Sequence, residues 1–377
     1  MSTTLPTPPT ITKIPTAPLY KMLPNQEDSC TYLKFDPKAP VQSLTQEEYT
    51  TLHPLDKSLY SALNGDFDMS FEILKSMPDN DLRVTFNLGL HYLQRNQFQK
   101  GFEHLDAGRY LGVFGSPTPL QNGIHIWQPS DPLQGKTLLF KCECGFGDQI
   151  INVRFAKFFK DQGADVIIAC DKALFNLFKK SFPWVSALVA EEGAQYVFAD
   201  YWLPAMSAPR LCCKDFSDLP GQPYINLYTS KPKKSRTLKV GLRWLGNQLY
   251  EHSQHRLFPS DLMLSLQDID NCDFYSLQKD NDTSDLPRLS MDTWEETAKS
   301  ISKLDLVISS CTSILHLSAA MGIETWGVIP VLPYYCWALP GPKSPWYDSL
   351  TLYRQVKYGD WSAPFDQVRR DLLAKTS

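Results

Sequence analysis

Three segments of the sequence combine glycines, cations and hydroxyl side chains in patterns that could bind an anion. The first is Cys144-Gly145-Phe146-Gly147-Asp148, between an apolar run and an amphipathic stretch. Glycines at such a junction let backbone N–H groups of Gly145 and Gly147 approach a phosphate or a developing anion, and the helix dipole adds to the attraction. Asp148 could act as a catalytic base, or it could stabilise the helix start through the dipole.

A dinucleotide fingerprint does not fit this first segment well. It needs a glycine or an alanine at position 150, where the chain has Ile150. Asp171, at the end of the next apolar run, could still imitate the ribose-binding acid of such proteins. A nicotinamide-dependent enzyme therefore remains a rival interpretation.

The second segment runs from Arg243 through Asn247 to Arg256, with His252 and His255 between them. Arginine offers a forked set of donors that suits phosphate, so the segment favours an anionic ligand over a solvated surface loop. A metal site at the two histidines is disfavoured, because no carboxylate or cysteine has the right partner spacing.

The third segment, Ser309-Ser310-Cys311-Thr312-Ser313-Ile314-Leu315-His316, leads from a strand pattern into a helix pattern. Thr312 and Ser313 could cap the helix or share their hydroxyls and first-turn N–H groups with a diphosphate. His316 would then lie one turn into the helix. Cys311 has no base identifiable beside it, so a nucleophile is not indicated.

Composition limits the classes of protein. The chain has 377 residues, which predicts two to three domains, and its net charge of −4 lacks the basic excess of most nucleic-acid binders. The 9 cysteines form no C-x-x-C pair, so neither a disulfide framework nor a zinc site is expected. We expect the protein to reside in a reducing cytoplasm. The paired acids at 268–270 and 280–282 fit turns better than a metal site. We expect no signal peptide and no transmembrane segment.

The elements that must position these segments begin with helices. Residues 1–40 are rich in Pro and Thr and predict an arm. Residues 41–115 have helical spacing, which predicts a cap of two or three antiparallel helices. Within it Asn87-Leu88-Gly89-x-x-Tyr92 is similar to one tetratricopeptide repeat. One repeat cannot form a solenoid, so a cap packed on the main body is favoured over a peptide-binding array, and a protein partner at the cap stays open.

Short β-rich runs then alternate with helical ones, which predicts parallel sheets covered on both faces. We expect two α/β domains, at residues 130–230 and 237–377, joined by a polar linker at 229–236. In the first domain the expected strands are 137–142, 165–170, 186–190 and 196–199, and the expected helices are 148–162 and 174–182. In the second, the expected strands are 238–244, 272–277, 305–309 and 324–329, and the expected helices are 260–266, 292–304 and 312–321. Two such doubly wound domains would hold a ligand in a cleft between the carboxyl ends of their strands.

Taken with residues 240–247, 276–279, 344–347 and 359–361, the three segments resemble glycosyltransferases of the GT-B architecture, specifically the heptosyltransferase-like family 9 group that often follows tetratricopeptide repeats. The match covers residues 87–373. It implies two Rossmann-like domains facing a central cleft with an N-terminal helical cap. It also implies inverting transfer of a hexosyl or heptosyl group from a nucleotide-diphosphate sugar to an acceptor hydroxyl, with no essential metal or other cofactor.

The resemblance also implies roles for individual residues. Asp148 falls at the position of the candidate base. The implied donor-binding residues are Gly145, Gly147, Arg243, Asn247, Arg256, Gln278, Lys279, Thr312, Ser313 and His316. Cys311 stands where heptosyltransferases commonly have an aspartate, so the nucleotide and the sugar stay open.

The acceptor is open as well. A lipid-linked sugar or a cell-surface glycan is implied by the resemblance, and a modified nucleobase or a protein side chain is an alternative. The substitution at Cys311 also motivates a rival from another class, a non-catalytic scaffold that keeps the GT-B shape and uses the helical cap to bind a partner.

Overall fold

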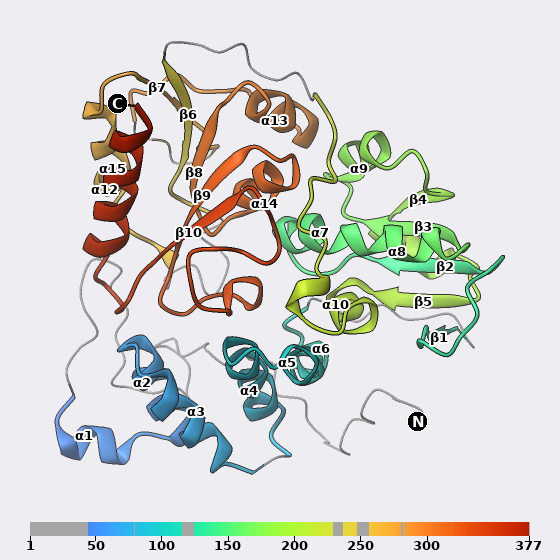
Figure 1. The fold of residues 1–377 in the computed structure, drawn as a ribbon. Helices are drawn as coiled ribbons and strands as arrows, with labels where there is room; N and C mark the ends of the chain where they lie inside the picture. The colour runs from blue at the N-terminus through green and yellow to red at the C-terminus, as the bar shows by residue number, and fades with distance from the viewer. Residues whose placement is uncertain are drawn as a thin grey trace. The chain divides into compact units, whose positions relative to one another are not determined.

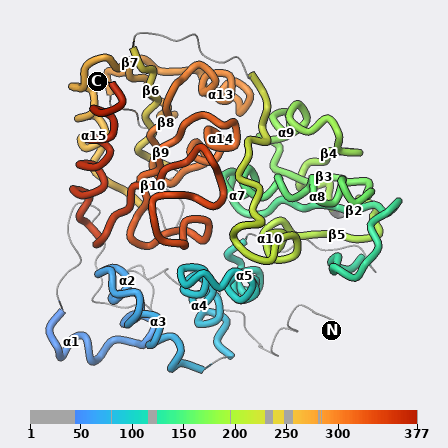
Figure 2. Tube along the Cα trace, in the orientation of Figure 1, coloured from blue at the N-terminus to red at the C-terminus, as the bar shows by residue number. Residues whose placement is uncertain are grey.

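The computed structural model describes residues 44–78, 80–114, 124–228, 237–246, 256–279, 282 and 284–376. The expected arm at 1–40, the linker at 229–236, Asn247 and the two histidines at 252 and 255 lie outside the described residues. Contacts divide the chain into two compact units. The first unit comprises the described residues from 80 to 220, and the second comprises those from 44 to 78 and from 221 to 376 (Figures 1 and 2).

The first unit contains a parallel sheet of 5 strands in the order β1-β5-β2-β3-β4. Its strands are β1 His125–Ile126, β2 Thr137–Lys141, β3 Asp165–Cys170, β4 Ala187–Ala190 and β5 Tyr201–Pro204. Its helices around the sheet are α7 Phe146–Asn152, α8 Ala156–Asp161, α9 Phe175–Ser181 and α10 Ala208–Cys212. The central strand β2 is almost wholly buried and is apolar at its three middle residues, as expected where both faces of a parallel sheet are covered.

The second unit repeats this plan with a parallel sheet of 5 strands in the order β10-β9-β8-β6-β7. Its strands are β6 Leu238–Arg243, β7 Cys272–Ser276, β8 Leu306–Ser310, β9 Glu324–Ile329 and β10 Leu350–Arg354. Its helices around the sheet are α12 Ser260–Leu264, α13 Trp294–Ile301, α14 Ser313–Ala320 and α15 Ser362–Thr376. The expectation of two doubly wound α/β domains is therefore confirmed, and the cleft between them stays a prediction.

The helical region is more finely divided than the sequence predicted. Instead of two or three helices, the described residues before β1 form α1 Gln46–Thr51, α2 Pro54–Leu63, α3 Phe67–Lys75, α4 Leu82–Gln94, α5 Phe98–Leu105 and α6 Ala107–Tyr110. Local signals explain the breaks. Pro54 occupies the first turn of α2, while the side chains of Asp66 and Asp81 accept hydrogen bonds at the N-termini of α3 and α4.

These helices are divided between the two compact units. Leu59 and Leu63 of α2 pack with Val331 and Tyr358 in a core cluster of the second unit. By contrast, α4, α5 and α6 belong to the first unit. The predicted domain boundaries, including a single cap at 41–115, stay predictions.

Helices α4 and α5 pack closely at two glycines. A Cβ added to Gly89 would lie 2.9 Å from the Gly101 carbonyl oxygen, and one added to Gly101 would lie 2.5 Å from a Leu93 side-chain atom. Small residues at these positions therefore let the two helix backbones approach.

The predicted strand at 196–199 is wrong. Tyr196 ends a 3₁₀ turn, and the strand that joins the sheet is β5, which begins five residues further on. Tyr196 and Phe198 are 72% and 86% exposed, whereas Val197 and Ala199 pack against a cluster around Trp202. Exposed and partly buried residues alternate in this segment as they would in a strand, but the segment packs against the sheet without joining it. The expected helix at 148–162 is also broken, by a 3₁₀ turn at Val153–Phe155.

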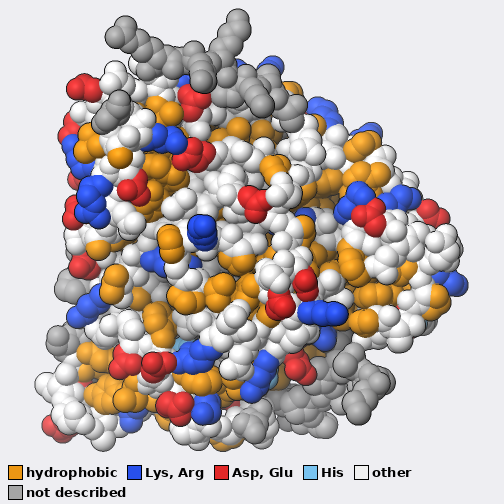
Figure 3. Space-filling model, viewed as in Figure 1, with side chains coloured by type: hydrophobic (Ala, Val, Ile, Leu, Met, Phe, Trp, Pro, Cys, Tyr) orange, Lys and Arg blue, Asp and Glu red, His pale blue; other side chains and the backbone are white. Residues whose placement is uncertain are grey.

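Charges of both signs are interspersed on the face shown in Figure 3, in keeping with the small net charge. Within the described ranges, no helix combines the length and the apolar character needed to cross a bilayer.

Candidate active site

The three loops that follow β6, β7 and β8 meet at one edge of the second sheet. Strand β6 lies between β8 and β7, and Arg243 at its end pairs in register with Ser309 of β8. The chain leaves β6 toward β7 and later returns to β8 on the other side. This makes the carboxyl end of β6 the topological switch point, where open α/β sheets bind ligands.

Gly246, Arg256 and Thr312 lie in contact at this edge. The Arg256 Nη1 atom donates a hydrogen bond of 2.7 Å to the carbonyl oxygen of Cys311. A Cβ added to Gly246 would lie 2.8 Å from Arg256 Nη2 and 3.1 Å from the Thr312 Cγ2 atom. The glycine therefore lets the β6 loop approach the guanidinium and the start of α14.

The hydroxyl of Thr312 does not cap α14. Thr312 occupies the N-cap position, but its side chain makes no cap hydrogen bond. Its Oγ1 atom lies 3.1 Å from the Ser309 Oγ atom, with either hydroxyl able to donate. Ser313 is the first residue of the helix. The capping interpretation of Thr312 is therefore wrong.

Two buried side chains brace the loops against each other. Gln278 accepts a hydrogen bond from the Leu245 N–H through Oε1 at 3.0 Å, and its Nε2 donates to the Leu245 carbonyl at 3.2 Å. Arg243 donates from Nη1 to the Leu277 carbonyl at 2.8 Å. Both therefore hold the backbone around the edge, and Lys279 stands exposed in the same loop.

His316 is buried in an aromatic cluster. Its Nδ1 atom lies 3.0 Å from the Tyr347 hydroxyl, and its ring stacks on Trp337 with the centroids 5.2 Å apart. Trp337 in turn donates from Nε1 to the Cys311 sulfur at 3.1 Å. The part of Trp337 in this cluster was missed from the sequence, because no local pattern links it to Cys311.

In the first unit, the glycine-rich loop leads from the central strand β2 into α7. Gly145 is the N-cap of α7, and Asp148 is the third residue of the helix, not the first as the sequence suggested. A Cβ added to Gly145 would lie 3.6 Å from Asp148 Oδ2, so this carboxylate lies beside the loop. Because β2 is flanked by β5 and β3, this loop also stands at the switch point of its sheet.

The loop is held in an uncommon conformation. Cys144 has a φ of 61°, which a side chain other than glycine rarely adopts. Buried Gln149 donates to the Cys144 carbonyl at 3.2 Å and accepts from the Asp171 N–H at 2.9 Å. The carboxylate of Asp171, which the nicotinamide interpretation would place on a ribose, accepts from the Ala173 N–H in its own turn.

Cys144 is not set up as a nucleophile. Burial raises the pKa of its thiol well above the ordinary value, and the charges of Asp148 and Glu143 raise it further. The thiol points to the Val113 carbonyl oxygen, 4.0 Å from the sulfur.

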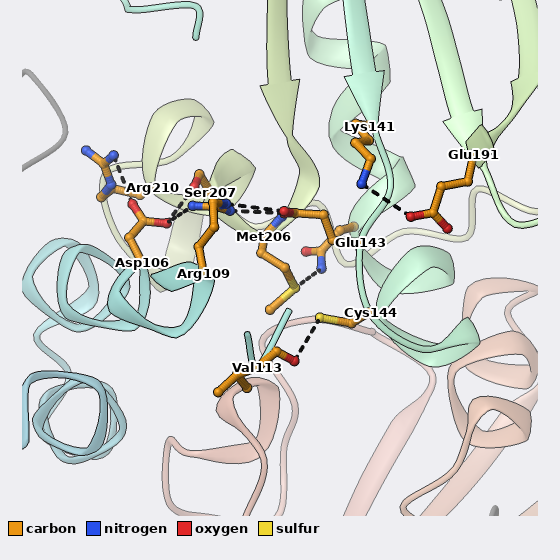
Figure 4. A network of polar contacts seen from close by, with 11 residues as sticks. Asp106, Arg109, Val113, Lys141, Glu143, Cys144, Glu191, Met206, Ser207 and Arg210 are labelled. Atoms are coloured by element: carbon orange, nitrogen blue, oxygen red, sulfur yellow. Dashed lines mark hydrogen bonds and ion pairs between the residues drawn. The ribbon is translucent and has the colours of Figure 1, made fainter. Parts of the chain in front are cut away.

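A buried polar network reaches the same loop from the helices (Figure 4). Glu143, the residue before Cys144, accepts two hydrogen bonds from Arg109, and Arg109 also pairs with Asp106. Asp106 accepts hydrogen bonds from Ser207, in the 3₁₀ turn after β5, and from Arg210 in α10. None of these residues belongs to a local pattern that would have marked it from the sequence.

The structure thus groups most of the predicted residues into two sets. One set lies in the loops and strand ends at one edge of the second sheet and comprises Arg243, Arg256, Gln278, Lys279 and Thr312, with Ser313 beginning α14 beside them. Gly145, Gly147 and Asp148 lie at the carboxyl end of β2 in the first. Among the described residues, no group of three or more His, Cys, Asp or Glu side chains is arranged to hold a metal ion.

No family model matches the chain, and no curated protein matches it significantly. Among solved structures, it is similar to the iron-containing dodecameric glycosyltransferase TibC from enterotoxigenic E. coli, with 10% identity, a TM-score of 0.44, and 62% of this chain and 67% of that chain covered. It is also similar to the ADP-heptose lps heptosyltransferase II of E. coli, with 11% identity, a TM-score of 0.44 and coverage of 64% and 98%. A glycosyl transferase family 9 protein from Veillonella parvula has 9% identity, a TM-score of 0.43 and coverage of 66% and 100%.

Proposed function

We propose that this chain is a glycosyltransferase that moves a sugar from a nucleotide-diphosphate sugar to an acceptor hydroxyl. The observation that carries the proposal is the meeting of Gly246, Arg256 and Thr312 at the switch point of the second sheet. A cation, a close backbone approach and a helix start are there together, which is the chemistry that recognises a diphosphate. The sequence resemblance to family 9 glycosyltransferases supports the same ligand.

In this proposal the second unit binds the donor. The positive charge of the Arg256 guanidinium and the first-turn N–H groups of α14 stabilise the diphosphate, both in the ground state and as it leaves. Gln278 and Arg243 keep the loops in place through their hydrogen bonds to Leu245 and Leu277. His316 acts at a distance, by packing the first turn of α14 against Trp337 and Tyr347.

The first unit supplies the base. Asp148 takes the proton of the acceptor hydroxyl, whose oxygen attacks the anomeric carbon from the face opposite the leaving group. One C–O bond forms as the bond between the anomeric carbon and the diphosphate oxygen breaks, and the electron pair leaves with the nucleoside diphosphate. The configuration at the anomeric carbon is inverted. Protein cations and helix N–H groups neutralise the leaving group, so no metal is required.

Binding of nucleotides tests the donor site. Isothermal titration of the protein with ADP, UDP, GDP and CDP, and with the matching nucleosides, is expected to show one diphosphate that binds at least about tenfold more tightly than its nucleoside, about 1.4 kcal/mol. Equal binding of a diphosphate and its nucleoside, or no binding of any of them, would contradict the proposal. The second result would favour a non-catalytic scaffold.

A further inference from the structure

The carboxylate of Glu143 is held from two sides just before the glycine-rich loop. Arg109 donates from Nε to Oε1 at 3.2 Å and from Nη2 to Oε2 at 3.0 Å, which is a bidentate pair. The Met206 backbone N–H donates to Oε2 at 3.0 Å. Helix α6 and the segment after β5 therefore both hold one side chain at the end of β2 (Figure 4).

The network around this pair is balanced in charge and hidden from solvent. The side chains of Asp106, Arg109, Glu143 and Arg210 are 4%, 14%, 7% and 11% exposed. Burial by itself lowers the pKa of Arg109, but the carboxylates of Glu143 and Asp106 outweigh it and leave the pKa raised. Arg109 is thus charged at every physiological pH.

A buried ion pair of this kind contributes little net stability to a fold. Removing two charges from water costs several kcal/mol per ion, and well-packed apolar side chains of similar volume often stabilise a fold as much or more. What a bidentate pair adds is a fixed geometry. Here the fixed geometry is that of residues 143 and 144, where the backbone turns into the left-handed region.

We propose that Arg109 and Glu143 are positioning residues, which hold the glycine-rich loop in the conformation that aims Asp148 at the acceptor hydroxyl. The inference rests on the proposed function for the role of Asp148, and on the contacts alone for the hold on the loop. It makes helix α6 a part of the active site, since Arg109 belongs to α6.

Hydrogen exchange measures the hold on the loop without any substrate. Arg109→Met removes the fork, and Arg109→Met combined with Glu143→Gln removes both charges while keeping both side chains near their native size. Arg210→Met is the matched control, because it removes the same charge from the same network without a contact to Glu143. In the first two variants we expect amide protection in peptides covering residues 142–149 to fall by about tenfold or more, with wild-type protection there in the control.

Turnover tests whether holding the glycine-rich loop matters for catalysis. With the nucleotide sugar that the wild type consumes, kcat of the double variant should fall by about 100-fold, the loss that a misplacement of about 1 Å can cause, while KM for the donor is unchanged. The Arg210→Met variant should keep the wild-type kcat. A double variant that folds with a fully protected loop would overturn the hold, and so would equal loss of protection in the control. A loosened loop with normal kcat would overturn the role in catalysis. If no nucleotide sugar is consumed by the wild type, the proposed function fails, and hydrogen exchange still decides the hold.

Discussion

At the scale of single residues, Arg256 carries the account of the donor site. Its Nη1 is committed to the Cys311 carbonyl, while the Nη2 side faces Gly246 at the edge of the sheet. Charge-assisted hydrogen bonds contribute about 1.5–3 kcal/mol, so Arg256→Ala should weaken binding of a nucleoside diphosphate by roughly 10- to 100-fold. The matching nucleoside should bind as before, as titration calorimetry can show.

Arg369→Ala is the control, because this exposed arginine of α15 pairs with Asp268 and is not one of the proposed donor-binding residues. It should leave both affinities unchanged. Equal losses for diphosphate and nucleoside in Arg256→Ala would mean that Arg256 holds the fold and does not hold phosphate.

His91 gives the first unit a dependence on pH. Burial in α4, helped by the charge of Arg95, lowers its pKa from 6.5 to about 3. The unfolded chain therefore binds one more proton than the folded chain between these two pH values. The stability that His91 contributes is complete above pH 6.5 and is lost progressively as the pH falls toward 3.

The free energy of unfolding should consequently fall by about 2 kcal/mol between pH 6.5 and pH 5 through this one group, at about 1.36 kcal/mol per pH unit. Urea denaturation of the wild type and of His91→Gln at several pH values measures the difference. The variant should show a flatter dependence over this interval, and parallel curves for the two proteins would refute the assignment to His91.

At the scale of elements, the β6 loop depends on having no side chain at position 246. Gly246→Ala would put a Cβ against the mobile end of Arg256, which can swing away, so stability should change little. Affinity for the nucleoside diphosphate should fall by about tenfold because the guanidinium is displaced. Calorimetry combined with thermal unfolding checks both parts.

Gly193→Ala is the matched substitution, since the nearest atom to an added Cβ there is Val189 Cβ at 3.9 Å. It should alter neither affinity nor stability. Retention of full affinity by Gly246→Ala would show that the contact between this loop and Arg256 is unimportant for the ligand.

The elements also show how far sequence can predict this fold. Strands β3 and β9 have the expected limits, because a glycine turn precedes each strand, at Gly163 and Gly322, and Asp171 and Pro330 follow them. The strand predicted at Tyr196 to Ala199 is absent, since side chains alternate there between exposed and partly buried positions but the backbone does not pair with the sheet. The sequence pattern does not predict strand β10 or helix α15, although residues 344–347 and 359–361 of the family resemblance lie on either side of β10.

The candidate site divides in the same way. Loops at strand ends, such as those of Arg243 and Thr312, could be predicted because strand order alone places them at one edge. The polar contacts that hold the glycine-rich loop could not be predicted, because Arg109 and Glu143 are 34 positions apart in the sequence and Asp106 and Arg210 are 104 apart. Contacts at such distances in sequence follow from packing, which leaves no local pattern.

At the scale of the whole molecule, the two units divide the proposed chemistry. Donor recognition falls to the second unit and deprotonation of the acceptor to the first. Hydrogen exchange with the preferred nucleoside diphosphate should therefore show added protection in peptides covering residues 243–246 and 309–316, with residues 142–149 nearly unchanged. Protection centred on residues 142–149 would place the nucleotide in the wrong unit.

The central claim is that this chain transfers a sugar, with Asp148 as its base. The most direct measurement is incubation of wild type and Asp148→Asn with a panel of nucleotide sugars and a mixed library of acceptors, followed by mass spectrometry of the products and by release of nucleoside diphosphate. We expect a glycosylated product with wild type, and turnover lower by about 10²- to 10⁴-fold in the variant at unchanged donor affinity. No product from any donor with wild type, or equal turnover in Asp148→Asn, would contradict it.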